Sequence, residues 1–138
     1  MGSIVTLLGH AGIVTAAVLF LLTFASRCEA QALDLSKAAV VVRSGERLPA
    51  ERAAADVLVE EIAKRTGLHW PVVTEWPAGR PVIALTVAGA ETGWGHACPA
   101  LAEPLAAEGY CVRTDGETVW VLGADGRGVL YGVGRLLR

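Results

Sequence analysis

The C-terminal segment, residues 108–138, reads as a β-hairpin followed directly by an amphipathic helix. The strands are expected at 110–114, where side chains alternate with a period of two, and at 118–122, which is β-branched and aromatic. Asp115-Gly116 between them tolerates positive φ, as a tight hairpin turn requires. After Asp125, a suitable N-cap, apolar residues recur at helical spacing. We therefore expect a final helix that packs back onto its own hairpin.

Four glycines interrupt this helix, at Gly126, Gly128, Gly132 and Gly134. Each costs about 1 kcal/mol relative to alanine in a helix interior, so their presence predicts close backbone packing. A dinucleotide-binding loop is the alternative interpretation of a glycine-rich turn after a strand. That fingerprint requires a third glycine where this chain has Tyr131, so we expect neither nucleotide binding nor any cofactor.

The preceding part of the chain alternates between strand and helix patterns. Strands are expected at 38–43, 70–74 and 81–88, and a helix from Pro49 to about Thr66 that ends at Gly67. With the hairpin and final helix, the order is β-α-β-β-β-β-α. This order predicts an α/β (α+β) two-layer sandwich, in which two helices cover one face of a mixed sheet of about five strands. Residues 89–107 lose all periodicity and are expected to form a long surface segment with a short helical turn around 100–106.

The N-terminus does not fit this pattern, because residues 4–25 are almost unbroken apolar sequence. Small residues near position 30 suit a signal-peptidase site, although no Lys or Arg precedes the apolar run. The run is also long enough to span a bilayer. Residues 1–32 are therefore interpreted as a signal peptide or an uncleaved N-terminal membrane anchor, and 33–138 as the globular domain. Both alternatives predict export to a periplasmic or extracellular location.

Charge and residue spacing exclude several classes of function. The formal net charge of −2 argues against a nucleic-acid partner, which would require clustered Lys and Arg. The three histidines, His10, His69 and His96, are far apart, and only His96 lies near a cysteine, Cys98. No metal site is therefore expected. Outside the expected helix at 49–66, the carboxylates considered are Glu75, Glu91, Glu103, Glu108, Asp115, Glu117 and Asp125. No two of them have a spacing that places both on one face of an expected element, so no catalytic residue is predicted.

Two tryptophans are the candidate substrate-binding residues. Trp76 and Trp94 fall in expected loops, where an indole ring can stack on a sugar. The alternative is that they belong to the core, as we expect for Trp120 in the middle of a strand.

Cys98 and Cys111 would be the only cysteines after cleavage near residue 32. In an oxidising compartment they either form a disulfide, which would tie segment 89–107 to the hairpin, or remain two thiols.

Several motifs resemble a known family. They are Glu108-Gly109-Tyr110, Gly128-Val129-Leu130-Tyr131-Gly132-Val133 and Leu136-Leu137, together with 53–58 and its continuation through Thr66-Gly67 to Pro71-Val72. They are similar to the N-terminal α/β domain of glycoside hydrolases, with the bacterial α-glucuronidase domain as the nearest match. The corresponding domain of β-N-acetylhexosaminidases, the hexosaminidase domain-2 type, is also similar. The resemblance spans about 40–138 apart from 89–107.

The resemblance implies that the catalytic carboxylates lie in a (β/α)8 barrel that would follow residue 138. We therefore expect a non-catalytic N-terminal accessory domain of an exported, α-glucuronidase-like enzyme of polysaccharide degradation. Its partner would be that barrel in cis, and the chain alone would be inactive and either a fragment or a free domain. The alternative is a free-standing carbohydrate-binding or interaction module of the cell envelope, with membrane contact only through residues 4–25 if they are uncleaved.

Overall fold

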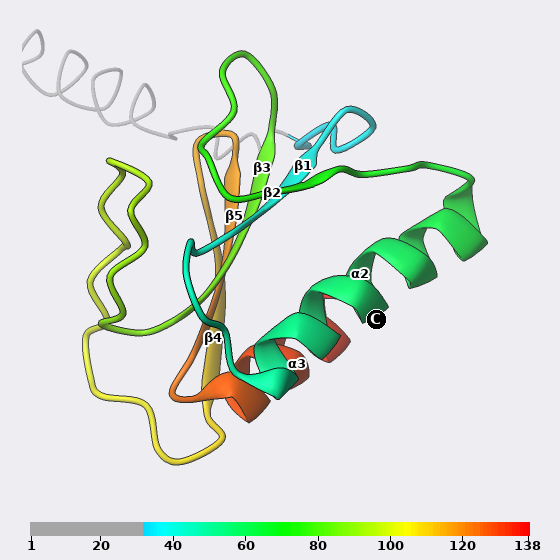
Figure 1. Ribbon diagram of the computed structural model, residues 1–138. Helices are drawn as coiled ribbons and strands as arrows, with labels where there is room; N and C mark the ends of the chain where they lie inside the picture. Colours follow the sequence, from blue (N-terminus) through cyan, green and yellow to red (C-terminus); the bar gives the residue numbers. More distant parts are fainter. Residues whose placement is uncertain (1–31) are drawn as a thin grey trace, which may run out of the picture. The chain divides into compact units, whose positions relative to one another are not determined.

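The fold is a five-stranded mixed sheet with two helices on one face (Figure 1). The computed structural model describes residues 32–138. The elements are β1 (Ala39–Val42), α2 (Pro49–Thr66), β2 (Val72–Val73), β3 (Val82–Val87), β4 (Tyr110–Asp115), β5 (Thr118–Gly123) and α3 (Gly126–Leu136). The predicted element order and the α/β two-layer class are both confirmed.

The sheet has the strand order β2-β1-β3-β5-β4. Strands β2, β1, β3 and β5 run parallel, and only β4 is antiparallel, to its hairpin partner β5. The strand expected at 70–74 is the two-residue β2 at one edge of the sheet, and the strand expected at 81–88 is β3 at its centre. Because β1, β3 and β5 are parallel, their carboxyl ends share one edge of the sheet. Helices α2 and α3 follow β1 and β5, so both helices begin at that edge.

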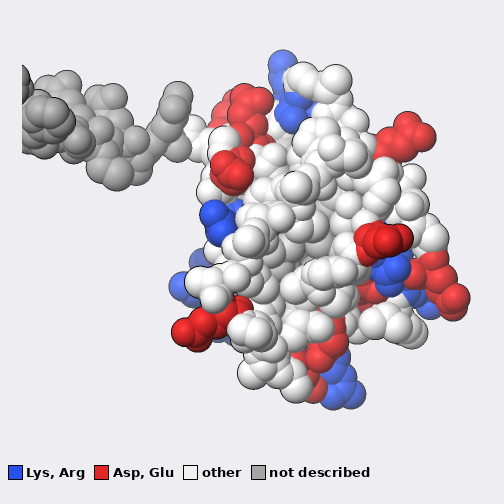
Figure 2. Space-filling view, turned by 90° about the vertical axis from the view of Figure 1, so that its left-hand side faces the viewer, with Lys and Arg blue, Asp and Glu red and all other residues white. Residues whose placement is uncertain are grey.

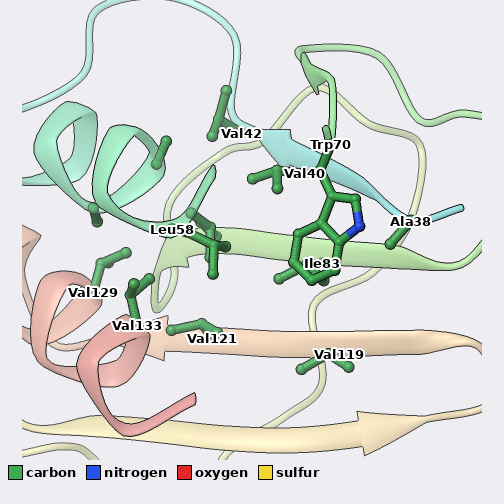
Figure 3. Packing of buried hydrophobic residues seen from close by; sticks show 13 residues of the cluster. Ala38, Val40, Val42, Leu58, Trp70, Ile83, Val119, Val121, Val129 and Val133 are labelled. Carbon is green, nitrogen blue, oxygen red and sulfur yellow. The ribbon is translucent and has the colours of Figure 1, made fainter. Parts of the chain in front are cut away.

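The main core lies between the helices and the sheet (Figure 3). Helix α2 contributes Ala54 and the fully buried Leu58, and the strands contribute central valines and isoleucine. The i, i+3 spacing from Ala54 predicts that Val57 is buried, but this is wrong, because Val57 is 38% exposed. The buried positions 51, 54, 55 and 58 and the partly buried position 62 recur at three- and four-residue intervals, and Val57 is turned away from that stripe. The buried members from the sheet and α3 include Val40, Ile83, Val121, Val129 and Val133.

Segment 89–107 covers the opposite face of the sheet, where a second apolar cluster lies. That cluster joins Trp94 of the segment to Trp120 and Leu122 of β5. The sheet centre is therefore buried on both faces, which explains the continuous apolar runs of β1 and β3. The expected helical turn near 100–106 is absent, and the expected surface segment is a covering layer that contributes core residues.

A buried ion pair joins the end of β1 to the start of α2. The guanidinium of Arg43 donates to both carboxylate oxygens of Glu51, at 2.8 and 2.7 Å, and the backbone N–H of Leu48 donates to Glu51 Oε2 at 2.8 Å. Glu51 is only 4% exposed. Burial acts to raise the pKa of Glu51, but hydrogen bonds from Arg43 and Leu48 outweigh it, so the pKa lies below its ordinary value. The carboxylate thus stays ionised and closes the first turn of α2.

The described residues form one compact unit, Leu33–Arg138. Within it, neither helix has the length and apolar character that crossing a membrane requires. The predicted signal peptide or anchor falls on residues 1–31, outside the described part of the chain.

Candidate functional site

Trp94 is a core residue. It is 6% exposed, and its indole Nε1 donates to the carbonyl oxygen of Val42 in β1 at 3.1 Å. Its ring also lies against the buried Trp120, with centroids 6.2 Å apart. An indole held in this way presents no open face, so the structure does not support the predicted stacking of Trp94 on a sugar.

Trp76 lies at the surface end of the same cluster. Its ring is half-buried and tilted against Trp94 and Trp120, with centroids 5.7 and 5.6 Å away. The exposed His96 stacks on it at 4.1 Å, with the planes only 11° apart, and His96 Nδ1 lies 3.1 Å from the carbonyl oxygen of Trp94. We call these four residues the aromatic cluster. The contribution of His96 was missed from sequence, because no spacing rule relates it to Trp76.

Two surface hollows meet at Trp76. One, of about 480 Å³, is lined by residues 72–77. The other, of about 390 Å³, is lined by residues that include Arg80, His96, Glu117 and Thr118. Both volumes lie within the ~300–1,000 Å³ range of small-molecule sites. On the face that carries segment 89–107, uncharged atoms fill most of the centre and charged side chains lie mainly around the rim (Figure 2).

Cys98 and Cys111 both lie half-buried against this second apolar cluster, and both are free thiols in the structure. No disulfide joins Cys98 and Cys111 in this structure; a disulfide and two thiols were the two alternatives from the sequence. Burial raises the pKa of the Cys98 thiol, which lowers its thiolate fraction and its reactivity.

A second group of polar residues joins the start of α3 to Glu108, which lies just before β4. Asp125 Oδ1 accepts from the backbone N–H of Gly128 at 2.9 Å, and its Oδ2 accepts from that of Glu108 at 3.0 Å. These hydrogen bonds lower the pKa of Asp125. Glu108 adopts a φ of 60° and pairs with Arg127 at 2.7 Å. The expected N-cap role of Asp125 is thus confirmed, and the same side chain also fixes the start of β4.

Two of the four helix glycines make the predicted close contacts most clearly. A Cβ on Gly128 would overlap the carbonyl oxygen of Gly109, and one on Gly132 would lie 2.6 Å from Val121 Cγ1. Gly134 does not follow this prediction, because a Cβ there would meet nothing within 4 Å. The inner face of α3 is therefore locked against the hairpin, while the position of Gly134 is open.

The other side of α3 forms a partly apolar surface around a hollow of about 260 Å³, which we call the α3 outer surface. Two tyrosines dominate it: Tyr110 is 41% exposed and Tyr131 is 49% exposed. Its full lining is Tyr110, Leu130, Tyr131, Gly134, Arg135 and Arg138.

The carboxylates with lowered pKa in residues 32–138 hold structure together: Asp34 accepts from Ser36, Glu51 pairs with Arg43, and Asp125 caps α3. The same residues contain no group of three His, Cys, Asp or Glu side chains placed to hold a metal ion. The candidate binding sites in residues 32–138 are therefore two surfaces, one around Trp76 and one on the outer side of α3.

Comparison with known proteins identifies the type of domain. Residues 26–138 match the family described as glycosyl hydrolase family 20, domain 2. A search of curated proteins finds no significant match. Similar solved structures include a GH138 enzyme targeting pectin rhamnogalacturonan II, with 20% sequence identity and a TM-score of 0.50. The match covers 73% of this chain but only 10% of that enzyme, and it supports the fold alone.

The chain is therefore an accessory domain of the glycoside hydrolase type. Specifically, it belongs to domain 2 of glycosyl hydrolase family 20.

Proposed function

We propose that this chain is the non-catalytic domain of an exported, α-glucuronidase-like glycoside hydrolase, and that it braces the catalytic barrel through the α3 outer surface. The family match supports an accessory role beside a catalytic domain. The α-glucuronidase link and the role in polysaccharide degradation rest on the motifs within residues 53–72 and 108–138, and export rests on the apolar run 4–25. Hydrolysis by paired carboxylates would belong to the barrel, so the chain alone would release no sugar.

The observation that carries this proposal is the contrast between the two sides of α3. Its inner side is fixed by the contacts of Gly128 and Gly132 and by the Asp125 cap. Its C-terminal end is held to α2, because Arg65 donates to the carbonyl oxygen of Leu137 at 2.7 Å. A helix fixed on one side presents its other side to a partner without further ordering, which lowers the entropic cost of binding.

The chemistry of the α3 outer surface suits a protein partner. Tyr110 and Tyr131 offer amphipathic rings around a hollow, with Arg135 and Arg138 beside them. Tyrosine and arginine are enriched in protein interfaces and among their energetic hot spots. Gly134 leaves room for close approach of a partner backbone.

A binding experiment tests the bracing role. An α-glucuronidase barrel without its own N-terminal domain is titrated with the purified chain, and complex formation is followed by calorimetry. Tyr131→Arg is expected to weaken binding tenfold or more, which corresponds to about 1.4 kcal/mol. Val57→Arg, at an exposed apolar position of α2 outside this surface, is the matched control and should leave binding unchanged.

Two results would refute the proposal. One is an equal effect of Tyr131→Arg and Val57→Arg, which would remove the assigned surface. The other is release of glucuronic acid from model glycosides by the purified chain alone.

A further inference from the structure

The surface around Trp76 has the organisation of a ligand site that is separate from the α3 outer surface. Trp76 and Pro77 line both hollows on this side of the molecule. An extended ligand that passes over Trp76 would therefore occupy both hollows. Trp76 lies with the second apolar cluster, on the sheet face opposite to the helices, so a partner bound at α3 leaves it uncovered.

The orientation of Trp76 is set before any ligand binds. Its ring rests on two buried indoles, Trp94 and Trp120, and Trp94 is itself hydrogen-bonded to β1. The stacked imidazole of His96 extends the aromatic surface toward the second hollow. Aromatic groups already held in place cost little entropy on binding.

The polar residues of the second hollow indicate the class of ligand. Arg80 and Glu117 are exposed, and neither side chain forms an ion pair or a hydrogen bond with residues 32–138. An arginine only donates hydrogen bonds, an ionised glutamate only accepts them, and the hydroxyl of Thr118 does both. A sugar hydroxyl also does both, whereas a charged ligand would meet one charge of its own sign. The combination therefore suits a neutral polyol that has an apolar face.

We propose that the Trp76 surface binds neutral pyranose units of a glycan chain, with the C–H face of a sugar against the exposed imidazole of His96, which is stacked on Trp76, and with hydroxyls at Arg80 and Glu117. The inference uses the membership in a glycoside hydrolase domain family and does not depend on the bracing role. In a full enzyme, such a site would hold polysaccharide near the catalytic domain.

Calorimetric titration with xylohexaose, cellohexaose and trigalacturonic acid tests the proposal, with intrinsic fluorescence as a second readout. At least one neutral hexasaccharide should bind, and trigalacturonic acid should bind tenfold or more weakly. Trp76→Ala should lower the affinity for the neutral sugar at least tenfold. The variants Arg80→Ala and Glu117→Gln should each lower the affinity for the neutral sugar severalfold. Both residues are exposed, so these two variants test the site even if Trp76→Ala does not fold. Tyr131→Ala, an exposed aromatic on the other surface, is the matched control and should not change it.

Flat titrations with both neutral sugars would overturn the inference. So would unchanged affinity in the Arg80 and Glu117 variants, or tighter binding of trigalacturonic acid, which would assign the surface to anions. Because the bracing test uses Tyr131 and this one uses Trp76, either proposal can fail while the other stands.

Discussion

Replacement of Gly128 with alanine is expected to lower the free energy of unfolding by about 3 kcal/mol, at the upper end for overpacking. The new Cβ would overlap the carbonyl oxygen of Gly109. That carbonyl cannot move easily, because it accepts from the N–H of Ala124 at 2.8 Å and Glu108 beside it is held by Asp125. Helix propensity alone predicts the opposite sign, a gain of about 1 kcal/mol. Urea denaturation of the variant and the wild-type protein measures the difference.

Gly134→Ala is the matched control on the same helix. A Cβ at Gly134 meets nothing within 4 Å, so alanine should stabilise the chain by about 0.5–1 kcal/mol through helix propensity and reduced unfolded-state entropy. Similar effects of the two substitutions would contradict the close packing assigned to Gly128.

Replacement of Glu51 with alanine is expected to cost about 3 kcal/mol, because it leaves the Arg43 guanidinium and the Leu48 N–H without their partner. The comparison is Glu61→Ala, which removes a solvent-facing pair with Arg65 and Lys64 on the same helix. An exposed pair contributes about 0.5 kcal/mol or less. Denaturation at neutral pH distinguishes the two, and an equally small loss from both variants would show that the buried pair does not stabilise the fold.

The pH dependence gives this prediction a second measurement. The pKa of Glu51 is lower in the folded chain than its ordinary value, so the ionised carboxylate stabilises the fold at any pH above the unfolded pKa of about 4.3. That contribution is lost as the pH falls through the folded pKa. The stability difference between wild type and Glu51→Ala should therefore be largest near pH 7 and shrink below about pH 4. A difference that grows in acid would contradict the assigned ionisation.

The geometry of α3 links stability to the proposed role. Asp125 connects the start of α3 to Glu108 beside the hairpin, and Arg65 of α2 connects to Leu137 at its far end. A partner bound at the α3 outer surface would therefore contact a helix that is held at both ends. The glycines of this stretch do not form a phosphate-binding loop, since Tyr131 replaces the third glycine of that fingerprint. Gly128 and Gly132 instead allow α3 to pack closely on the hairpin.

The elements were predictable because each depends on local patterns. The hairpin, the Asp125 cap and the Gly67 helix end are local, and all three occur in the structure. The turn itself consists of Gly116 and Glu117, one residue later than expected, because Asp115 pairs with Thr118 in the sheet. Residues 89–107 were not predictable, because their side chains are ordered by contacts with distant strands. Trp94, for example, donates to Val42, 52 residues earlier in the chain.

The sequence by itself determined the strand and helix order and the two-layer class, because periodicity and turn chemistry act over a few neighbouring residues. Tertiary structure alone decided that Gly128 is confined while Gly134 is open, although both are glycines of the same helix. It likewise decided that Trp94 is buried while Trp76 reaches the surface under His96. These differences depend on which distant backbone or ring lies opposite each residue, and no local pattern carries that information.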